Sequence, residues 1–246
     1  LRHLTRQPVR SLGTVAGVAA GLALNMAMLM IYAGFDHTIA VTFGFADRSD
    51  ATAAFIHPVS RTVEQEIAAL PGVIETEAMR LVPVQFRNGV ISHRGELTGL
   101  PEGSRLNRAL TPDLVPIRLP ADGVVLSRGL AGLLEVNPGD LLRAEVTEGR
   151  RRDLVLPVAA VSDTLLGAPA YMRLDALSRA IGEPDLISAV SMRTDAAQSG
   201  PLFDDLRNRP MVAGVSIKTD SFKAFRRIAD EGAGQMRFVF GAIAFM

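Results

Sequence analysis

The sequence predicts an α+β protein in which an N-terminal transmembrane helix precedes a mixed helix-and-strand domain outside the cytoplasm. Three observations support this fold class. A run of 25 residues near the N-terminus carries no charge, and a second apolar run closes the chain. The stretch between them alternates helical patterns with extended ones.

The first 35 residues have the charge pattern of a membrane anchor. Residues 1–10 form a basic leader without acids, and Ser11–Phe35 contains no Asp, Glu, Lys, Arg or His. As a helix this run extends about 37 Å, more than a hydrocarbon core of about 30 Å. Basic residues stay on the cytoplasmic side, so we expect a cytoplasmic N-terminus and an extracytoplasmic chain from Asp36 onward. The alternatives are a cleaved signal peptide, whose apolar core is normally shorter, and a buried soluble helix.

Small residues recur every four positions within this predicted span. Gly13, Gly17 and Gly21 lie on one stripe of the helix, and Asn25 continues it. Such spacing lets a second helix backbone approach closely, and the amide can hydrogen-bond across the contact. We therefore predict a helix-packing seam at these four residues. The alternative is ordinary small-residue content in an Ala/Gly-rich segment.

The end of the chain resembles the beginning of another span. Arg237 is the last charged residue, and Phe238–Met246 is apolar to the terminus. Nine residues are too few to cross a bilayer, so we interpret residues 236–246 as the start of a second transmembrane helix. Residues 36–235 would then form one extracytoplasmic domain.

The first part of this domain reads as a helix followed by a hairpin. Residues 61–70 place apolar side chains at helical spacing, with Ser60 as the expected N-cap. Residues 73–87 alternate as a strand, and Asn88-Gly89 is a strong hairpin signal. Residues 90–97 are the expected return strand.

A later segment repeats the order of helix, proline, valine and strand. Residues 185–193 read as a strand, residues 198–207 as a helix, and residues 212–218 as another strand. Two such units predict a split α/β core with pseudo-symmetry, made of residues of about 50–94 and 185–218.

The residues between the two units, about 95–184, are expected to form a β-rich insertion. Turn signals are dense there, and Leu174, Leu177 and Ile181 predict a helix closed by Gly182. The other expected elements are strands at 124–127, 141–146 and 154–161 and a helical turn at 128–134. After the second unit, residues 221–235 are expected to form a stalk helix that leads into the second span.

Composition excludes several functional classes. Lys plus Arg and Asp plus Glu number 26 each, which argues against nucleic-acid binding. The chain has no cysteine, no Gly-Lys-Ser/Thr phosphate loop and no GxSxG motif, so we expect no enzyme, cofactor or metal site. His93, Ser127 and Ser162-Asp163 are the sole candidates for catalysis, and no common spacing unites them. Arg150-Arg151-Arg152 is interpreted as a solvated hairpin turn, with contact to anionic lipid or a partner as the alternative.

Several phrases, taken in order, resemble FtsX-like (MacB-type) ABC transporter permeases. They are Arg6–Ser11 before a Gly-rich span, Ala68–Val73 after the first domain helix, and Gly123–Ala131 followed by Leu134–Asp140. The similarity covers essentially the whole chain. The two later spans and the cytoplasmic loop of such permeases are absent from this stretch. The missing initiator Met also fits the second unit of a duplicated permease.

The resemblance implies a permease subunit in the bacterial inner (cell) membrane. Its partners would be a separate cytoplasmic ABC ATPase subunit, a second permease copy or pseudo-repeat, and the lipid bilayer. The α/β core would be the porter-like part, and the stalk would carry movement from the ATPase to the extracytoplasmic domain by mechanotransmission. Family members handle lipoproteins, lipids, peptides or macrolides, or regulate cell-wall hydrolases.

The predicted topology also fits a second class of protein. A membrane-anchored sensor has an extracytoplasmic domain between two transmembrane helices and signals inward. Further apolar spans after Met246 would favour the permease, whereas a signalling helix pair followed by kinase or cyclase motifs would favour the sensor.

Overall fold

A computed structural model describes the domain and part of the N-terminal segment. The described residues are 47–149, 151–164 and 167–220, together with 13, 15–17, 19–24, 26–28, 30, 31 and 34. The domain residues and the N-terminal residues belong to two different compact units, and each is described by itself.

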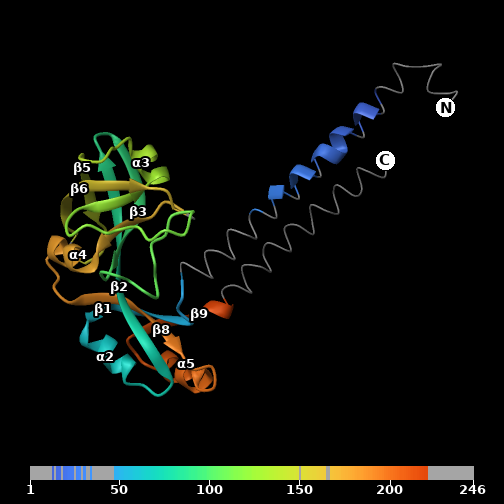
Figure 1. The fold of residues 1–246 in the computed structure, drawn as a ribbon. Coiled ribbons are helices and arrows are strands. Elements are labelled where there is room, and N and C mark those ends of the chain that lie inside the picture. Colours follow the sequence, from blue (N-terminus) through green and yellow to red (C-terminus); the bar gives the residue numbers. More distant parts are fainter. Residues whose placement is uncertain are drawn as a thin grey trace. The chain divides into compact units, whose positions relative to one another are not determined.

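The domain contains nine strands and four helices within its described residues (Figure 1). In chain order they are β1 (Ala51–Ser60), α2 (Thr62–Ala68), β2 (Val73–Asn88), β3 (Ile91–Leu100), β4 (Val124–Ser127), α3 (Arg128–Leu134), β5 (Leu141–Val146), β6 (Asp153–Ser162), β7 (Ala170–Arg173), α4 (Leu174–Ile181), β8 (Leu186–Thr194), α5 (Ser199–Arg207) and β9 (Val212–Ile217).

Four strands form an antiparallel sheet in the order β2-β8-β1-β9, which we call the core sheet. The chain builds it from two β-α-β units, β1-α2-β2 and β8-α5-β9. This is the split β-α-β arrangement. Helices α2 and α5 cover one face (Figure 1), where Val63 and Ile67 share a hydrophobic cluster with Leu202 and Leu206. The pseudo-symmetric pair of units expected from the repeated helix–proline–strand order is therefore present.

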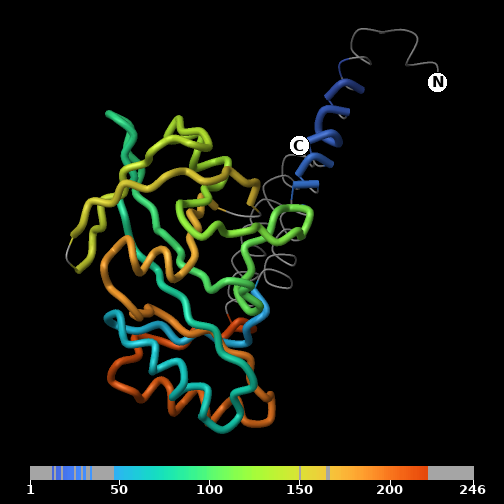
Figure 2. The backbone as a smooth tube through the Cα atoms, turned by 60° about the vertical axis from the view of Figure 1, so that its left-hand side comes forward, coloured from blue at the N-terminus to red at the C-terminus, as the bar shows by residue number. Residues whose placement is uncertain are grey.

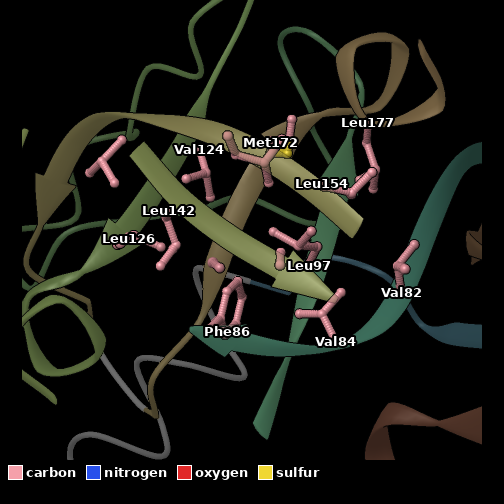
Figure 3. Packing of buried hydrophobic residues seen from close by; sticks show 14 of the residues in the cluster. Val82, Val84, Phe86, Leu97, Val124, Leu126, Leu142, Leu154, Met172 and Leu177 are labelled. Atoms are coloured by element: carbon pink, nitrogen blue, oxygen red, sulfur yellow. The ribbon is translucent and has the colours of Figure 1, made fainter. Parts of the chain in front are cut away.

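The second half of β2 leaves this sheet and joins a closed barrel. Strand pairings run β2-β3-β7-β4-β6-β5 and return to β2, so six strands close on themselves. Closure removes the unpaired edges that an open sheet would expose. Inward side chains from all six strands fill the interior, among them Val84, Phe86, Leu126, Leu142 and Met172 (Figure 3).

Two short helices pack against the barrel. Helix α3 begins after Ser127, whose hydroxyl accepts a hydrogen bond from the Leu130 N–H at 3.2 Å. Helix α4 ends at Gly182, which has the left-handed φ of +69° common at helix ends. Leu177 and Leu174 of α4 pack over Gly99, and a β-carbon at this position would require the end of the Leu177 side chain to shift.

Most elements expected from the sequence are confirmed, and two were missed. The Asn88-Gly89 turn joins β2 to β3 in antiparallel register, with Asn88 opposite Ile91. Ser60 is not the N-cap of α2. Arg61 holds that position, although the Ser60 hydroxyl accepts a hydrogen bond from the Thr62 N–H at 3.3 Å. The two missed elements are β1 and β7, for which no strand was predicted.

The membrane segments expected from the sequence lie largely outside the described residues. The leader at 1–10, the stalk at 221–235 and the second span at 236–246 fall outside them entirely. The described residues between 13 and 34 are helical. In the described part of the chain, no helix combines the length and apolarity needed to cross a membrane.

Candidate functional site

The structure describes three of the four predicted helix-packing residues. Gly13, Gly17 and Gly21 are helical and exposed, and a β-carbon added at any of them meets no atom within 4 Å. Asn25 lies outside the described residues. The seam therefore stays a prediction, with its glycine positions open to an approaching helix.

Two of the residues considered for catalysis, Ser127 and Asp163, form local structural contacts. Ser127 caps α3, and Arg128 donates hydrogen bonds to Asp163 at 2.5 and 2.9 Å. These bonds lower the pKa of Asp163, opposite to the shift that a general base near neutral pH needs. His93 lies on β3 opposite Phe86. No group of three or more metal-ligating side chains gathers among the residues the structure describes.

The basic triplet also has a structural contact. Arg150 lies outside the described residues, and Arg151 is exposed at the turn between β5 and β6. The Arg152 guanidinium lies against Gly182, at the end of α4. Both described arginines of the triplet are exposed, as expected for a solvated turn, and Arg152 also lies against the end of α4.

A buried arginine lies where β2 passes from the core sheet into the barrel. Arg80 is only 3% exposed. Its Nη2 lies 3.1 Å from Glu183, which follows α4, and 2.8 Å from Glu148, in the turn after β5. Its Nη1 donates to the Ser188 hydroxyl of β8 at 2.6 Å.

The Arg80 cluster joins three parts of the domain that are far apart in sequence. Burying a guanidinium is costly unless carboxylates and other acceptors surround it, and here Glu148, Glu183 and Ser188 do so from the barrel side and from the core sheet. Glu96 of β3 adds a further carboxyl nearby. Its pKa is raised mainly by burial and also by the charge of Glu148, against the lowering effect of a hydrogen bond from Thr98.

Glu77 holds the β3–β4 loop, which we define as residues 101–123. Its carboxylate is buried and accepts hydrogen bonds from the N–H groups of Arg105 at 2.7 Å and of Leu106 and Asn107 at 3.1 Å. The Ser104 hydroxyl donates to the same carboxylate. A single side chain of β2 therefore fixes the start of this long loop.

The first and last described residues of the domain lie side by side. Lys218 N–H donates to the Asp50 carbonyl at 2.9 Å, and Lys218 Nζ donates to the Asp47 carbonyl at 2.5 Å. Asp47 also forms an isolated bridge with Asn107 of the β3–β4 loop, which Figure 2 shows beside the start of the domain. Residues 218–220 are helical directly after β9, with no intervening turn.

Sequence reasoning missed both Arg80 and Glu77. A signal for Arg80 was present, because it has the same parity along β2 as Val82, Val84 and Phe86, which were expected to face inward. A charged residue on an apolar face indicates a buried ion pair. Glu77 carried no comparable signal, because its partners are backbone groups of a loop.

The comparisons with known proteins concern the domain. No protein-family model and no curated protein matches the sequence. The extracellular domain of YknZ, a noncanonic ABC-type transporter from Gram-positive bacteria, is similar in structure with a TM-score of 0.42 and 15% identity, over 69% of this chain and 98% of that one. The periplasmic region of MacB from Actinobacillus actinomycetemcomitans has a TM-score of 0.45 and 12% identity, over 74% and 94%.

Proposed function

We propose that the chain is part of the permease subunit of an ABC transporter. In this proposal the domain from about residue 36 to 235 is extracytoplasmic, and a separate cytoplasmic ATPase hydrolyses ATP. The catalytic step is assigned to that ATPase, and movement of the membrane helices reaches the domain through the segments that flank it.

The observation that carries the proposal is the adjacency of the two ends of the domain. β1 and β9 are paired strands, with Ala51 opposite Ile217. The segments that precede Asp47 and follow Asp220 therefore start from one side of the core sheet. A domain inserted between two membrane helices requires this geometry, because both connections return to the same bilayer.

The link after β9 supports a mechanical role. Because residues 218–220 turn helical directly after the strand, a stalk helix would join the core sheet without a flexible linker. The Lys218 hydrogen bonds to Asp47 and Asp50 tie the two links together. A displacement of the stalk would therefore move the whole sheet.

The described part of the N-terminal helix supports the membrane location. Leu22, Met26 and Met30 are between 65% and 70% exposed, and Val15 and Ile31 have 62% and 69% exposure. Apolar side chains exposed along a helix need lipid or another helix to cover them. The proposed partners are the bilayer and a second permease copy or pseudo-repeat.

Insertion of two glycines between Ile217 and Lys218 tests this function. The full-length protein is purified from membranes, and any ATPase subunit that accompanies it is identified by mass spectrometry. We expect the insertion to leave the ATPase bound. The effect of the extracytoplasmic domain on the rate of ATP hydrolysis should fall about ten-fold or more, because the two are no longer coupled. The same two glycines inserted at the Asn88-Gly89 turn are the control and should have no effect.

Two results would contradict the permease proposal. One is the absence of any ATPase from the purified protein. The other is the presence of a histidine kinase or cyclase domain on the same polypeptide, which would favour the membrane-anchored sensor instead.

A further inference from the structure

The β3–β4 loop encloses a pocket that the proposed function does not use. Its volume is about 550 Å³, within the range of small-molecule sites. Leu100, Ile117 and Leu119 contribute apolar lining, and Arg108 and Arg118 also line the pocket. The pocket thus combines an apolar lining with positive charge.

The charges around the pocket favour an anion. Arg108 is half-buried, and its pKa is lowered first by burial and then by the positive charge of Arg48. Arg118 adds a second cationic side chain to the lining, so the charge of the pocket is complementary to an anion. Glu102 also lines the pocket, but its carboxylate is paired with Arg173 at 3.0 Å.

The tip of the same loop presents an apolar side chain to solvent. Val115 is 57% exposed between Leu114 and Pro116. The tip is held in shape, because the Thr111 N–H donates to the Val115 carbonyl at 2.9 Å and Leu110 forms a bridge with Pro116. An ordered apolar tip beside basic side chains matches the chemistry of a membrane interface.

The loop also contacts the first described residues of the domain. Asn107 forms a bridge with Asp47, and the Arg48 N–H donates to the Leu106 carbonyl at 2.7 Å. Only the eleven residues 36–46 separate Asp47 from the predicted span. The loop is therefore tied to the part of the domain next to the predicted membrane anchor.

We propose that the β3–β4 loop binds an anionic phospholipid of the same bilayer, with Arg108 and Arg118 at the headgroup phosphate and Val115 among the lipid chains. This inference rests on the proposed function, from which it takes the position of the membrane. The bound lipid would hold the domain against the bilayer surface and is not a transported cargo.

None of these 246 residues is a cysteine, so a cysteine introduced here is the single labelling site within them. Val115→Cys of the full-length protein is labelled with an environment-sensitive fluorophore and reconstituted in nanodiscs of phosphatidylcholine, with or without phosphatidylglycerol. A nitroxide on the lipid chain reports insertion by quenching. We expect strong quenching only with phosphatidylglycerol. Val90→Cys, at the fully exposed turn between β2 and β3, is the matched control and should stay unquenched.

Charge variants test the headgroup contact. R108Q/R118Q should weaken the phosphatidylglycerol dependence by about five-fold for each arginine removed, and R108K/R118K should retain most of it. The unfolding temperature of both variants is measured alongside, and only variants that unfold like the parent are compared. An unchanged lipid dependence in R108Q/R118Q would overturn the proposal.

The remaining arms separate lipid from other ligands. Equal quenching in phosphatidylcholine alone would overturn the requirement for an anionic lipid. A spectral change caused by free glycerol phosphate without quenching would assign the pocket to a soluble anion instead. ATPase co-purification is scored on the same preparation, so that loss of quenching with the ATPase present overturns the lipid proposal alone.

Discussion

Arg80 connects three parts of the domain through a single buried side chain. It is almost wholly removed from water, yet two carboxylates, the Ser188 hydroxyl and the Leu81 carbonyl surround it. Its contact with Glu148 is close but is not aligned as a hydrogen bond, and its Nε has no hydrogen-bond partner within the described residues. The cluster connects β2 to the turn after β5, to the residue after α4 and to β8.

Removing this guanidinium should destabilise the domain. Arg80→Ala leaves a cavity and two carboxylates without their cation, although both are partly exposed and regain some water. We expect a loss of about 2–4 kcal/mol, measured as the change in urea unfolding of the full-length protein in detergent. Arg87→Ala, on the same strand but about half exposed in its pair with Glu145, should cost under about 1 kcal/mol. Equal losses would contradict the role given to Arg80.

The raised pKa of Glu96 predicts that the stability of the domain depends on pH. Because its pKa is raised in the folded domain, the folded state keeps this proton to higher pH than the unfolded chain. Its contribution to stability therefore falls as pH rises above the unfolded value of about 4.3. Glu96→Gln should raise the unfolding temperature at about pH 7 relative to the parent and leave it unchanged at about pH 4.

The control for Glu96 keeps the carboxyl group. Glu96→Asp should preserve the difference between the two pH values. A Gln variant with the same effect at both would show that the pH dependence has another source.

At the scale of elements, the sequence predicted what periodicity and turn chemistry determine. The bounds of β4, α3 and β5 match the predicted ranges, because apolar alternation, Ser127 and the Pro138-Gly139 turn mark them locally. β1 was missed since its inward residues Ala51 and Ala53 are small and Pro58 interrupts it. Its register shift between Ala54 and Val59 accommodates that proline. The signal that remained was the alternation of Ala51, Ala53 and Phe55, all buried.

The β3–β4 loop should depend on Glu77 for its order. Glu77→Gln keeps the size of the side chain but replaces one acceptor with a donor that faces backbone N–H groups. We expect amide hydrogen exchange at Arg105, Leu106 and Asn107 to accelerate about ten-fold or more, measured by mass spectrometry. Glu66→Gln, exposed on α2, should leave these amides unchanged. Slow exchange in the Glu77 variant would mean that other contacts order the loop.

At the scale of the whole molecule, local sequence patterns do not predict which strands pair with each other. The two helix–strand pairs α2-β2 and α5-β9 follow from repeated local order, but closure of the barrel depends on pairs such as β3 with β7, which are some 70 residues apart in the chain. Arg80 and Glu77 acquire their roles through partners that such pairings bring to them. The membrane topology and the helix-packing seam remain predictions.

The paired ends of the domain predict an engineered disulfide. Ala51 and Ile217 are opposite each other in antiparallel strands, within the distance that a disulfide spans. A51C/I217C should therefore cross-link under mild oxidation, detected by mass spectrometry of the intact protein. If the segments before Asp47 and after Asp220 move together, the cross-linked protein should keep the coupling between ATP hydrolysis and the domain. Loss of coupling that a reductant restores would show that the two links must separate during the cycle.

Strand β2 is shared by the core sheet and the barrel, and this sharing has a mechanical consequence. Sixteen residues of continuous strand join the two halves, so no linker between them can absorb a rotation. A rotation of the core sheet at its paired ends would therefore also rotate the barrel. The domain would then move as one rigid body, and the displacement of its far end would depend on its length more than on an internal hinge.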